Sequence, residues 1–409
     1  MRTIARIANG RTVENACIYK AARTNFGRIG GGLSQIRPDD LSATVIKSLT
    51  DILPDGLHTR IDSVVWGATN GAGEDNRNVG RMALLLAGLP VTTPATTVNR
   101  LCGSSLDAAM HVSREIEVGE AILAIAGGSE SMTRAPWVLP KTDRSFPIGD
   151  KILVSTTLGW RLINDRMPSE WTVSLGECNE QLRERFPISR ERQDAFALQS
   201  HKRAAQAWAE GFYDSHVISI PGNELTRDES IRSDTSLDAL ARLEPLFRTD
   251  GTITAGNASP MNDGAAGVLI GSAGASTRVG CEPMARVAGR ATVANDPRLF
   301  GIAPIEAANL ALERAGITWS DVGAVELNEA FAVQSLACID SWPVDPDVVN
   351  IRGGALAIGH PLAASGARLL TTLAYVLREN GQRWGVATMC IGVGQGQAIV
   401  LENMQVQSS

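Results

Sequence analysis

Cys102 lies in a sequence that is typical of a nucleophile at the start of a helix. It stands in NRLCGSSLDAAM, where small residues follow it and Leu106 and Met110 then recur at helical spacing. This pattern predicts a turn that leads into a helix N-terminus, where unpaired N–H groups and the helix dipole lower the pKa of a thiol. An isolated cysteine is more often a buried structural residue, so the motif alone leaves both interpretations open.

His360 lies between a glycine and a proline in GGALAIGHPLAASGAR. Gly353, Gly354 and Gly359 allow close approach of the backbone, and Pro361 fixes the turn after the histidine. A lone histidine is usually a satisfied core or surface residue, whereas one in this setting more often points into a pocket. His360 is therefore a candidate base for a thiol.

Cys390 and Asn328 each follow an apolar run. Cys390 stands in TMCIGVGQGQA, where the backbone N–H groups around Gly392 and Gly394 could face an anion, as in an oxyanion hole. The motif fails as a dinucleotide-binding fingerprint, because the glycine spacing is wrong and no helix follows. Asn328 in VELNEAFA could face a site or simply cap the next helix.

The elements that must position these residues alternate between short apolar runs and helical patterns, which is typical of an α/β fold. Buried strands are expected at 63–67, 121–126, 267–271, 323–326, 385–389 and 397–401. The last two are expected to form an antiparallel pair across the glycine-rich turn. Helices are expected at 192–209, with a cap near Ser189, and at 304–315.

Composition indicates a globular protein of two or three domains. The chain has 409 residues, of which 44% are hydrophobic and 20% charged. A net charge of −6 argues against nucleic acid as a general partner. Six scattered cysteines without a C-x-x-C motif indicate free thiols and no metal site. Without a signal-peptide pattern, a peroxisomal tripeptide or an apolar run of membrane length, we expect a cytoplasmic protein without a membrane partner.

Together the motifs resemble those of the thiolase family. The matching segments run in family order from KAARTNFGRIGGGLSQIRPDDL through LCGSSLDA, GGSESMTRAP, GTITAGNASPMNDGAA and NEAFA to GGALAIGHP and CIGVGQG. The resemblance covers nearly the whole chain. It implies a five-layered αβαβα sandwich of two similar halves, with an inserted loop domain that binds coenzyme A (CoA).

The resemblance also implies a division of the chain. Residues 1–131 would form the N-terminal half, completed by 256–281, and residues 282–409 the C-terminal half. The loop domain would be 132–255, which is richer in Trp, Arg, Pro and charged residues than the rest. CoA is implied as a co-substrate, with no permanently bound cofactor, and the protein as a homodimer or homotetramer.

Roles are carried over to the matching residues. Cys102 resembles the acyl-accepting nucleophile, His360 the residue that activates it, and Cys390 the acid/base at the α-carbon. Asn328 resembles the residue that holds a water with His360 in one oxyanion hole, and the N–H groups of Cys102 and Gly392 resemble the second hole. Cleavage of a 3-oxoacyl-CoA needs a thiolate that attacks the ketone, a proton for the departing enolate, and donors for two oxyanions.

Further residues resemble parts of the CoA and acyl sites. Ser259 in AGNAS resembles a serine that bonds the pantetheine arm, and Arg232 in DESIRSD a basic residue near the adenine nucleotide. Phe331 resembles an apolar wall of the acyl pocket. The segments GAGEDNRNVGRMALLLAGLP, TTLGWRLIND and CIGVGQG are most similar to the β-ketoadipyl-CoA thiolase branch, which implies 3-oxoadipyl-CoA as the substrate.

A substrate of that branch carries a carboxylate at the end of its acyl chain. A buried carboxylate needs a cationic or multiply hydrogen-bonded partner. Arg134, Arg161 and Arg352 are the candidates in this sequence.

Several positions depart from the family pattern and leave the acyl specificity open. These departures are Ser105, Pro260, Arg352, Ala363 and the segment 174–182. An acetyl-CoA C-acetyltransferase and a general 3-ketoacyl-CoA thiolase are therefore alternatives. A decarboxylating condensing enzyme would need His or Asn in place of Cys390, and a cysteine hydrolase would not explain that cysteine. A non-catalytic CoA-binding scaffold would normally have lost a catalytic residue.

Overall fold

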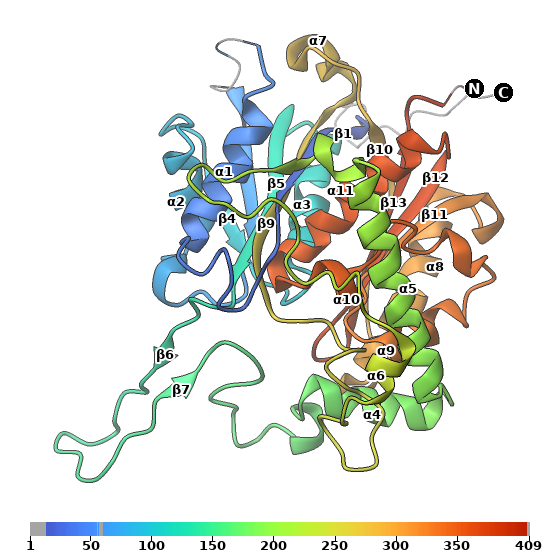
Figure 1. Cartoon of the computed structure of the whole chain (residues 1–409). Coiled ribbons are helices and arrows are strands. Elements are labelled where there is room, and N and C mark those ends of the chain that lie inside the picture. Colours follow the sequence, from blue (N-terminus) through green and yellow to red (C-terminus); the bar gives the residue numbers. More distant parts are fainter. Residues whose placement is uncertain (1–13, 55, 57–59, 407–409) are drawn as a thin grey trace.

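A long sheet runs through the protein as two halves that meet at β1. In the computed structural model, which describes residues 14–54, 56 and 60–406, the strands follow the order β11-β12-β13-β10-β1-β9-β5-β3-β4. Only two residue pairs are formed between β1 (Ala16–Thr24) and β10 (Ala285–Ala294). Because this seam is so short, the two halves can diverge and enclose helices between them (Figure 1).

Each half combines parallel and antiparallel pairing. In the first half, β3 (Ser63–Gly67) pairs in parallel with β4 (Ala95–Val98) and β5 (Leu123–Ser131), and β9 (Asn262–Ser272) lies antiparallel between β5 and β1. The short β2 (Gly27–Arg28) and β8 (Val217–Ile218) pair with β9 and β1.

The second half carries the other predicted strands. In it, β11 (Val322–Leu327) pairs in parallel with β12 (Trp384–Ile391), and β13 (Gln395–Asn403) lies antiparallel between β12 and β10. The predicted antiparallel pair across the glycine-rich turn is therefore confirmed.

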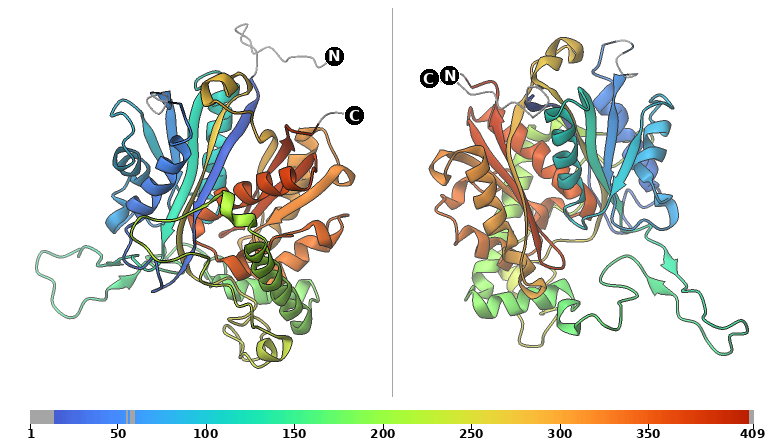
Figure 2. Two further views of the ribbon diagram at one scale, coloured as in Figure 1. Left: turned by 45° about the horizontal axis from the view of Figure 1, so that its top comes forward. Right: turned by 180° about the vertical axis from the view of Figure 1, so that it is seen from behind.

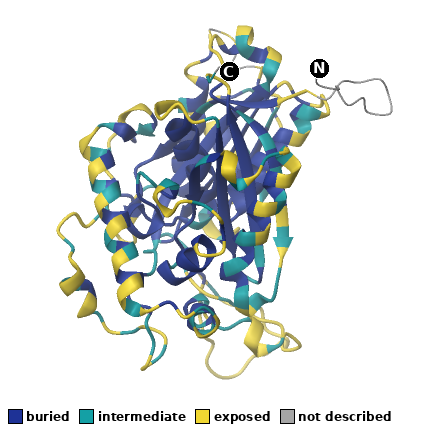
Figure 3. Cartoon of the chain, turned by 90° about the vertical axis from the view of Figure 1, so that its right-hand side faces the viewer, coloured by how far each residue is buried: buried dark blue, intermediate teal, exposed yellow. Residues whose placement is uncertain are grey.

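Alternation along the strands divides the molecule into five layers. In β9, Val268 and Ile270 pack with the central helices α3 (Ser104–Glu117) and α11 (Ser365–Glu379), whereas Leu269 packs outward against α1 (Pro38–Thr50) and α2 (Val79–Leu86). In β13, Leu401 faces the central layer and Val400 faces α8 (Ala303–Ala315). The period-2 alternation of strands thus produces the predicted αβαβα sandwich, whose interior is buried in Figure 3.

Residues 132–255 form most of the structure outside these layers. An arm with β6 (Trp137–Val138) and β7 (Val154–Ser155) extends away from the body, as Figures 1 and 2 show. It is followed by α4 (Leu175–Arg185), α5 (Arg190–Ala209) and α6 (Leu237–Ala241). Helix α5 packs against α9 (Ala332–Ile339) and α10 (Ala355–Ile358), so this segment also supports the second half. The short α7 (Ser276–Val279) follows β9.

All six predicted strands and both predicted helices are present. The Ser189 hydroxyl accepts the N–H of Arg192, which confirms the predicted cap of α5. No helix of the described part of the chain is long and apolar enough to cross a membrane. The expectations about a signal peptide and a C-terminal tripeptide concern residues 1–13 and 407–409, which lie outside the described residues.

Candidate active site

Cys102 lies in the turn between β4 and α3, as predicted. The turn is closed by Ser104, whose hydroxyl accepts the N–H of Arg100 (2.9 Å) and donates to the carbonyl of Leu101 (2.6 Å). Leu101 has a φ of 48°, which is uncommon for a residue with a side chain. Such strain is tolerated where the surrounding structure holds it, and it often occurs at functional sites. The cysteine is 8% exposed.

The β12–β13 hairpin brings a second cysteine to the same place. Cys390 lies near the end of β12, and Gly392, Val393 and Gly394 make the turn into β13. Val393 and Gly394 have φ values of 61° and 70°. The backbone N–H groups of Gly392 and of Cys102 itself face the Cys102 sulfur. This pair of donors has the arrangement of an oxyanion hole.

Both thiols are protonated in the resting protein. Burial raises the pKa of Cys102 to about 12, although the two N–H groups act in the opposite direction. Burial also raises the pKa of Cys390, and the nearby Cys102 adds to that rise, so the two thiols do not ionise together. The predicted lowering of the Cys102 pKa is therefore wrong for the resting protein, because lost hydration outweighs the helix N-terminus.

His360 is a neutral base whose free nitrogen faces Asn328. Arg368 donates to Asn328 Oδ1 (3.2 Å), so the Asn328 amide presents its Nδ2 to His360 Nε2 at 3.5 Å. This network assigns the ring proton to Nδ1, which lies 2.6 Å from Ser365 Oγ. Burial, with a smaller effect of Arg368, lowers the pKa of His360 to about 3. Nε2 is thus unprotonated and able to accept a proton.

The N-terminal ends of α3 and α11 meet, which brings the elements of Cys102 and His360 together. Ser105 Oγ accepts the N–H of Ala367 (2.8 Å), and a Cβ on Gly366 would lie 2.4 Å from the backbone N of Leu106. Ser105, a departure from the family pattern, therefore joins the two helices. Within the described residues, no hydrogen bond links His360 to either cysteine.

A buried ion pair holds Asn328 in place through a hydrogen bond from its arginine. Asn328 follows β11, and Arg368 of α11 contacts it while pairing with Glu326 at 3.1 Å. The side chains of Arg368 and Glu326 are at most 2% exposed, and burial raises the pKa of Glu326 to about 8. Removing Glu326 would leave the buried charge of Arg368 without its partner, and Arg368 is the residue that holds the Asn328 amide through its 3.2 Å hydrogen bond.

Two glycines before His360 stand where there is no room for a side chain. A Cβ on Gly359 would lie 2.5 Å from Asn262 Cγ, and the Asn262 side chain accepts the N–H of His360 (3.1 Å). A Cβ on Gly354 would lie 2.1 Å from the Glu329 carboxyl carbon. The close backbone approach predicted for these glycines is confirmed at both positions.

The predicted CoA-site residues divide into two groups. Ser259 donates its N–H to the carbonyl of Ala330 (3.0 Å), and the adjacent Phe331 packs on the apolar cluster that contains Cys390. Ser259 is therefore bonded to the segment that follows Asn328 at the end of β11, and Phe331 lies on that segment. Arg232 is exposed, its backbone N–H bonds His201 on α5 (3.2 Å), and it does not line the pocket that contains Cys102.

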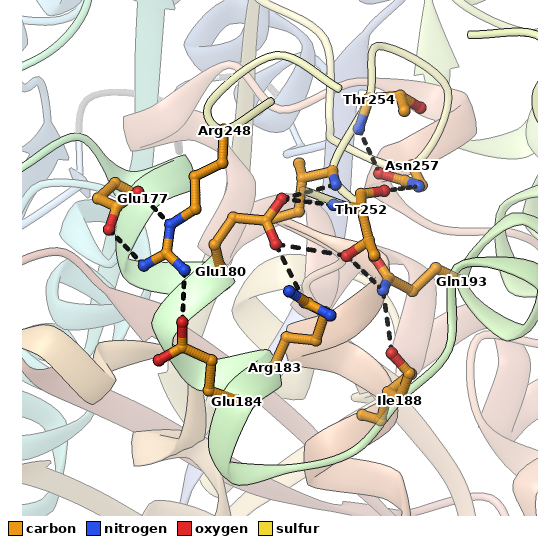
Figure 4. A network of polar contacts seen from close by, with 11 residues as sticks. Glu177, Glu180, Arg183, Glu184, Ile188, Gln193, Arg248, Thr252, Thr254 and Asn257 are labelled. Atoms are coloured by element: carbon orange, nitrogen blue, oxygen red, sulfur yellow. Dashed lines mark hydrogen bonds and ion pairs between the residues drawn. The ribbon is translucent and has the colours of Figure 1, made fainter. Parts of the chain in front are cut away.

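A network of charges holds the turn before Ser259 (Figure 4). Glu180 on α4 is buried and accepts the N–H groups of Thr252 (2.7 Å) and Ile253 (2.8 Å). Arg248 bridges Glu177 and Glu184 on the same helix. Glu177 and Glu180 both lie in the segment 174–182, so this segment positions the turn although it departs from the family pattern.

A pocket of about 360 Å³ opens above Cys102. Cys102 and Gly392 lie in its lining, whereas Cys390, Asn328 and His360 are buried and do not line it. Its apolar walls are Leu101, Met132, Leu158, Trp160, Leu175 and Leu362, and its polar walls include Asn70, Glu130, Thr156 and Arg161.

Several residues of this site were not predicted from the sequence. Ser365 and Arg368 lie in the same GHPLAASGARLL motif as His360, and an arginine within an apolar helical stretch was the available signal. Trp160 lies in the segment TTLGWRLIND, whose similarity to the β-ketoadipyl-CoA thiolase branch was the available signal. In the described part of the chain, no group of three or more His, Cys, Asp or Glu side chains could hold a metal ion.

Comparison with known proteins identifies the class of this site. The family model described as "Thiolase, N-terminal domain" matches residues 16–274, and "Thiolase, C-terminal domain" matches residues 281–403. The chain therefore belongs to the thiolase family, and it is an acyltransferase.

Individual proteins of the family show which members this chain is similar to. The chain is 46% identical over 402 residues to "Beta-ketoadipyl-CoA thiolase" of Acinetobacter baylyi, covering 96% of this chain and 100% of that protein. It is 44% identical to "3-oxoadipyl-CoA/3-oxo-5,6-dehydrosuberyl-CoA thiolase" of Escherichia coli, with the same coverage. The crystal structure of human mitochondrial 3-ketoacyl-CoA thiolase in complex with CoA superposes with a TM-score of 0.89 at 35% identity, covering 96% of this chain and 98% of that one.

Proposed function

We propose that this thiolase cleaves 3-oxoadipyl-CoA with CoA to give succinyl-CoA and acetyl-CoA. The supporting observation is the similarity over nearly the full length to relatives that carry that substrate in their names. CoA acts as the co-substrate, and no permanently bound cofactor is needed. The six free cysteines are consistent with a reducing, cytoplasmic environment, which fractionation of cells would test.

In the proposed mechanism, Cys102 attacks the 3-oxo carbon while His360 Nε2 takes its proton. The oxyanion that forms is stabilised by donors that include Asn328. The bond between C2 and C3 then breaks, which leaves the acyl group on the Cys102 sulfur and an acetyl-CoA enolate. Cys390 protonates the enolate at C2. The thiol of an incoming CoA gives its proton to the Cys390 thiolate and attacks the Cys102 thioester, whose oxyanion meets the N–H groups of Cys102 and Gly392. Breaking the bond to the Cys102 sulfur releases the acyl-CoA, and the protonated His360 returns its proton to that sulfur.

We also propose that residues 132–255 act as the CoA-binding loop domain between halves made of 1–131 with 256–281 and of 282–409. Ser259 would bond the pantetheine arm, and Phe331 would form an apolar wall of the acyl pocket. Arg232, which is exposed, would meet the adenine nucleotide end. The fixed turn before Ser259 supports this proposal, because a preorganised site loses less entropy on binding.

Substrate preference is the test of this proposal. We expect kcat/KM for 3-oxoadipyl-CoA to exceed that for 3-oxohexanoyl-CoA, which has a methyl group in place of the carboxylate, by at least about tenfold. Acetoacetyl-CoA in the same assay tests the acetyltransferase alternative. Equal or faster cleavage of the uncharged esters would contradict the proposed substrate and leave a general thiolase.

A homo-oligomer is the proposed assembly, with a second copy of the chain covering the arm. The arm exposes large apolar side chains, among them Trp137 (68%), Phe146 (89%) and Ile148 (97%). Such a concentration of exposed apolar area marks an interaction surface. We expect light scattering to give a dimer or tetramer, and the double variant Phe146→Ser with Ile148→Ser to lower that mass. A monomeric wild type would contradict the proposal.

A further inference from the structure

One arginine in the pocket above Cys102 has no carboxylate partner. Arg161 is half-buried and donates to the backbone carbonyls of Thr156 (3.4 Å) and Asn70 (3.1 Å). It forms no ion pair with any residue that the structure describes. A guanidinium has five N–H donors, so most of its capacity remains for an anion in the pocket.

The other two candidate arginines are already neutralised. Arg134 forms a two-point contact with Glu74 (2.5 and 2.6 Å). Arg352 pairs with Glu210 and Glu379 at the surface, away from the lining of the pocket. Neither of these residues therefore offers an unpaired cation to a substrate carboxylate.

Arg161 belongs to a short segment that also covers the reaction centre. The ring of the preceding Trp160 lies 3.0 Å from where a Cβ would stand if Gly392 had a side chain. Trp160 therefore forms a wall next to Gly392, one of the two residues whose N–H groups face the Cys102 sulfur. Thr156 fixes the start of the segment, because its hydroxyl accepts from Asn70 Nδ2 (2.9 Å) and donates to the Pro136 carbonyl (2.5 Å). The same segment thus supplies an apolar wall and a cation to the pocket that Cys102 lines.

We propose that Arg161 binds the terminal carboxylate of the acyl chain while Cys102 holds its reacting carbonyl. This inference rests on the proposed function and names the residue that selects dicarboxylic over monocarboxylic chains. Arg161 is the only cationic side chain in the lining, and a carboxylate left unpaired against the apolar walls would be unfavourable. A planar guanidinium can bind a carboxylate through two parallel hydrogen bonds.

The phosphates of CoA are a less suitable partner for Arg161. They lie a full pantetheine arm away from the thioester, whereas Arg161 shares a pocket of about 360 Å³ with Cys102. Both a charged and an uncharged acyl-CoA carry the same phosphates. A role of Arg161 in CoA binding would therefore affect the two substrates equally.

Glu130 is the only carboxyl group in the same lining, and it does not oppose this role. Its Oε2 faces the N–H groups of Thr69 (3.2 Å) and Ala363 (3.4 Å), and it is 4% exposed. Burial raises the pKa of Glu130 to about 7, so near neutral pH it carries only part of a negative charge. Repulsion of a substrate carboxylate is reduced accordingly.

The test compares 3-oxoadipyl-CoA with 3-oxohexanoyl-CoA in the wild type, Arg161→Gln, Arg161→Lys and the matched control Arg166→Gln. Gln retains donors for the two carbonyls but has no charge, and Arg166 is an exposed arginine of the same loop. We expect Arg161→Gln to lower kcat/KM for 3-oxoadipyl-CoA about 10- to 100-fold and to change that for 3-oxohexanoyl-CoA less than about threefold. Arg161→Lys should keep part of the preference, and Arg166→Gln all of it.

The outcomes separate this inference from the proposed function. A wild type without preference for 3-oxoadipyl-CoA would contradict the proposed substrate and, with it, the role of Arg161. A wild-type preference that survives Arg161→Gln would overturn only the role of Arg161. An equal loss for both substrates would show that Arg161 merely holds the loop or binds CoA, and would also overturn the inference.

Discussion

Replacing Cys102 by alanine is expected to reduce kcat/KM for thiolytic cleavage by about four to six powers of ten, the size of effect seen when a covalent nucleophile is removed. No other cysteine can take its place. Cys390 is 2% exposed and lies outside the lining of the pocket, and so do the other four cysteines, which are Cys17, Cys178, Cys281 and Cys338. Only Cys102 combines access to the pocket with the two facing N–H groups.

Mass spectrometry of peptides after incubation with acyl-CoA measures this directly. The acyl group should appear on Cys102 in the wild type and on no peptide of Cys102→Ala. Cys281→Ala, which removes an exposed cysteine, is the control and should behave like the wild type. Acylation of a different cysteine would remove Cys102 from its proposed role.

The same pair of residues predicts the pH dependence of acylation. With a pKa of about 12 for Cys102 and about 3 for His360, the resting pair is a thiol and a neutral imidazole across the accessible pH range. Neither group changes protonation between about pH 5 and pH 10, so the acylation rate of the wild type should show no titration of the thiol or the imidazole there, and a change centred near pH 7 would come from Glu130 in the same lining, whose pKa is about 7. A rise in rate centred near pH 8.5 would show instead that the resting thiol ionises as a free cysteine does.

Local pattern was sufficient to predict the parts of the site that lie within one motif. The turn at Cys102, the turn after Cys390 and the loop at His360 each depend on glycine and small residues within a few positions, and such constraints are visible in sequence. Six of the strands also followed from short apolar runs between breakers, whereas strands such as β1 and β4 were not predicted. The half-buried β10 was missed, because its alternation of buried and partly exposed residues leaves no continuous apolar run.

Contacts between distant segments could not be predicted in the same way. Ser105 bonds Ala367, 262 residues further along the chain, and Arg368 bonds Glu326 across two elements. The raised pKa of Cys102 was missed for a related reason. The helix N-terminus is visible in the sequence, but the loss of hydration depends on everything packed around the sulfur.

Arg161 shows what the sequence can and cannot predict about a charged side chain. Three arginines were candidates for a substrate carboxylate, since sequence shows charge but not pairing. The structure pairs Arg134 and Arg352 with glutamates, whereas Arg161 lines the same pocket as Cys102 and forms no ion pair with any described residue. Selecting among them required only the positions of Glu74, Glu210 and Glu379.

Replacing Cys390 by alanine is expected to separate the two halves of the reaction. Cys102 and its N–H donors would remain, so acyl transfer from an acyl-CoA to Cys102 should continue within about tenfold of the wild-type rate. The C2 carbon would then have no group to give or take its proton. Losing such general acid–base catalysis lowers a reaction rate by about two to four powers of ten. Cleavage and condensation should both fall by that factor.

Exchange of the α-protons of acetyl-CoA in deuterated water isolates the affected step. We expect Cys390→Ala to accept the acyl group yet to exchange these protons at least about a hundredfold more slowly than the wild type. Cys178→Ala is the matched control, because Cys178 is a buried cysteine in the same apolar cluster and the change removes the same atom. It should leave exchange nearly unchanged. If Cys390→Ala exchanged protons and cleaved substrate like that control, Cys390 would be a packing residue, and the proton would have to come from another group at C2.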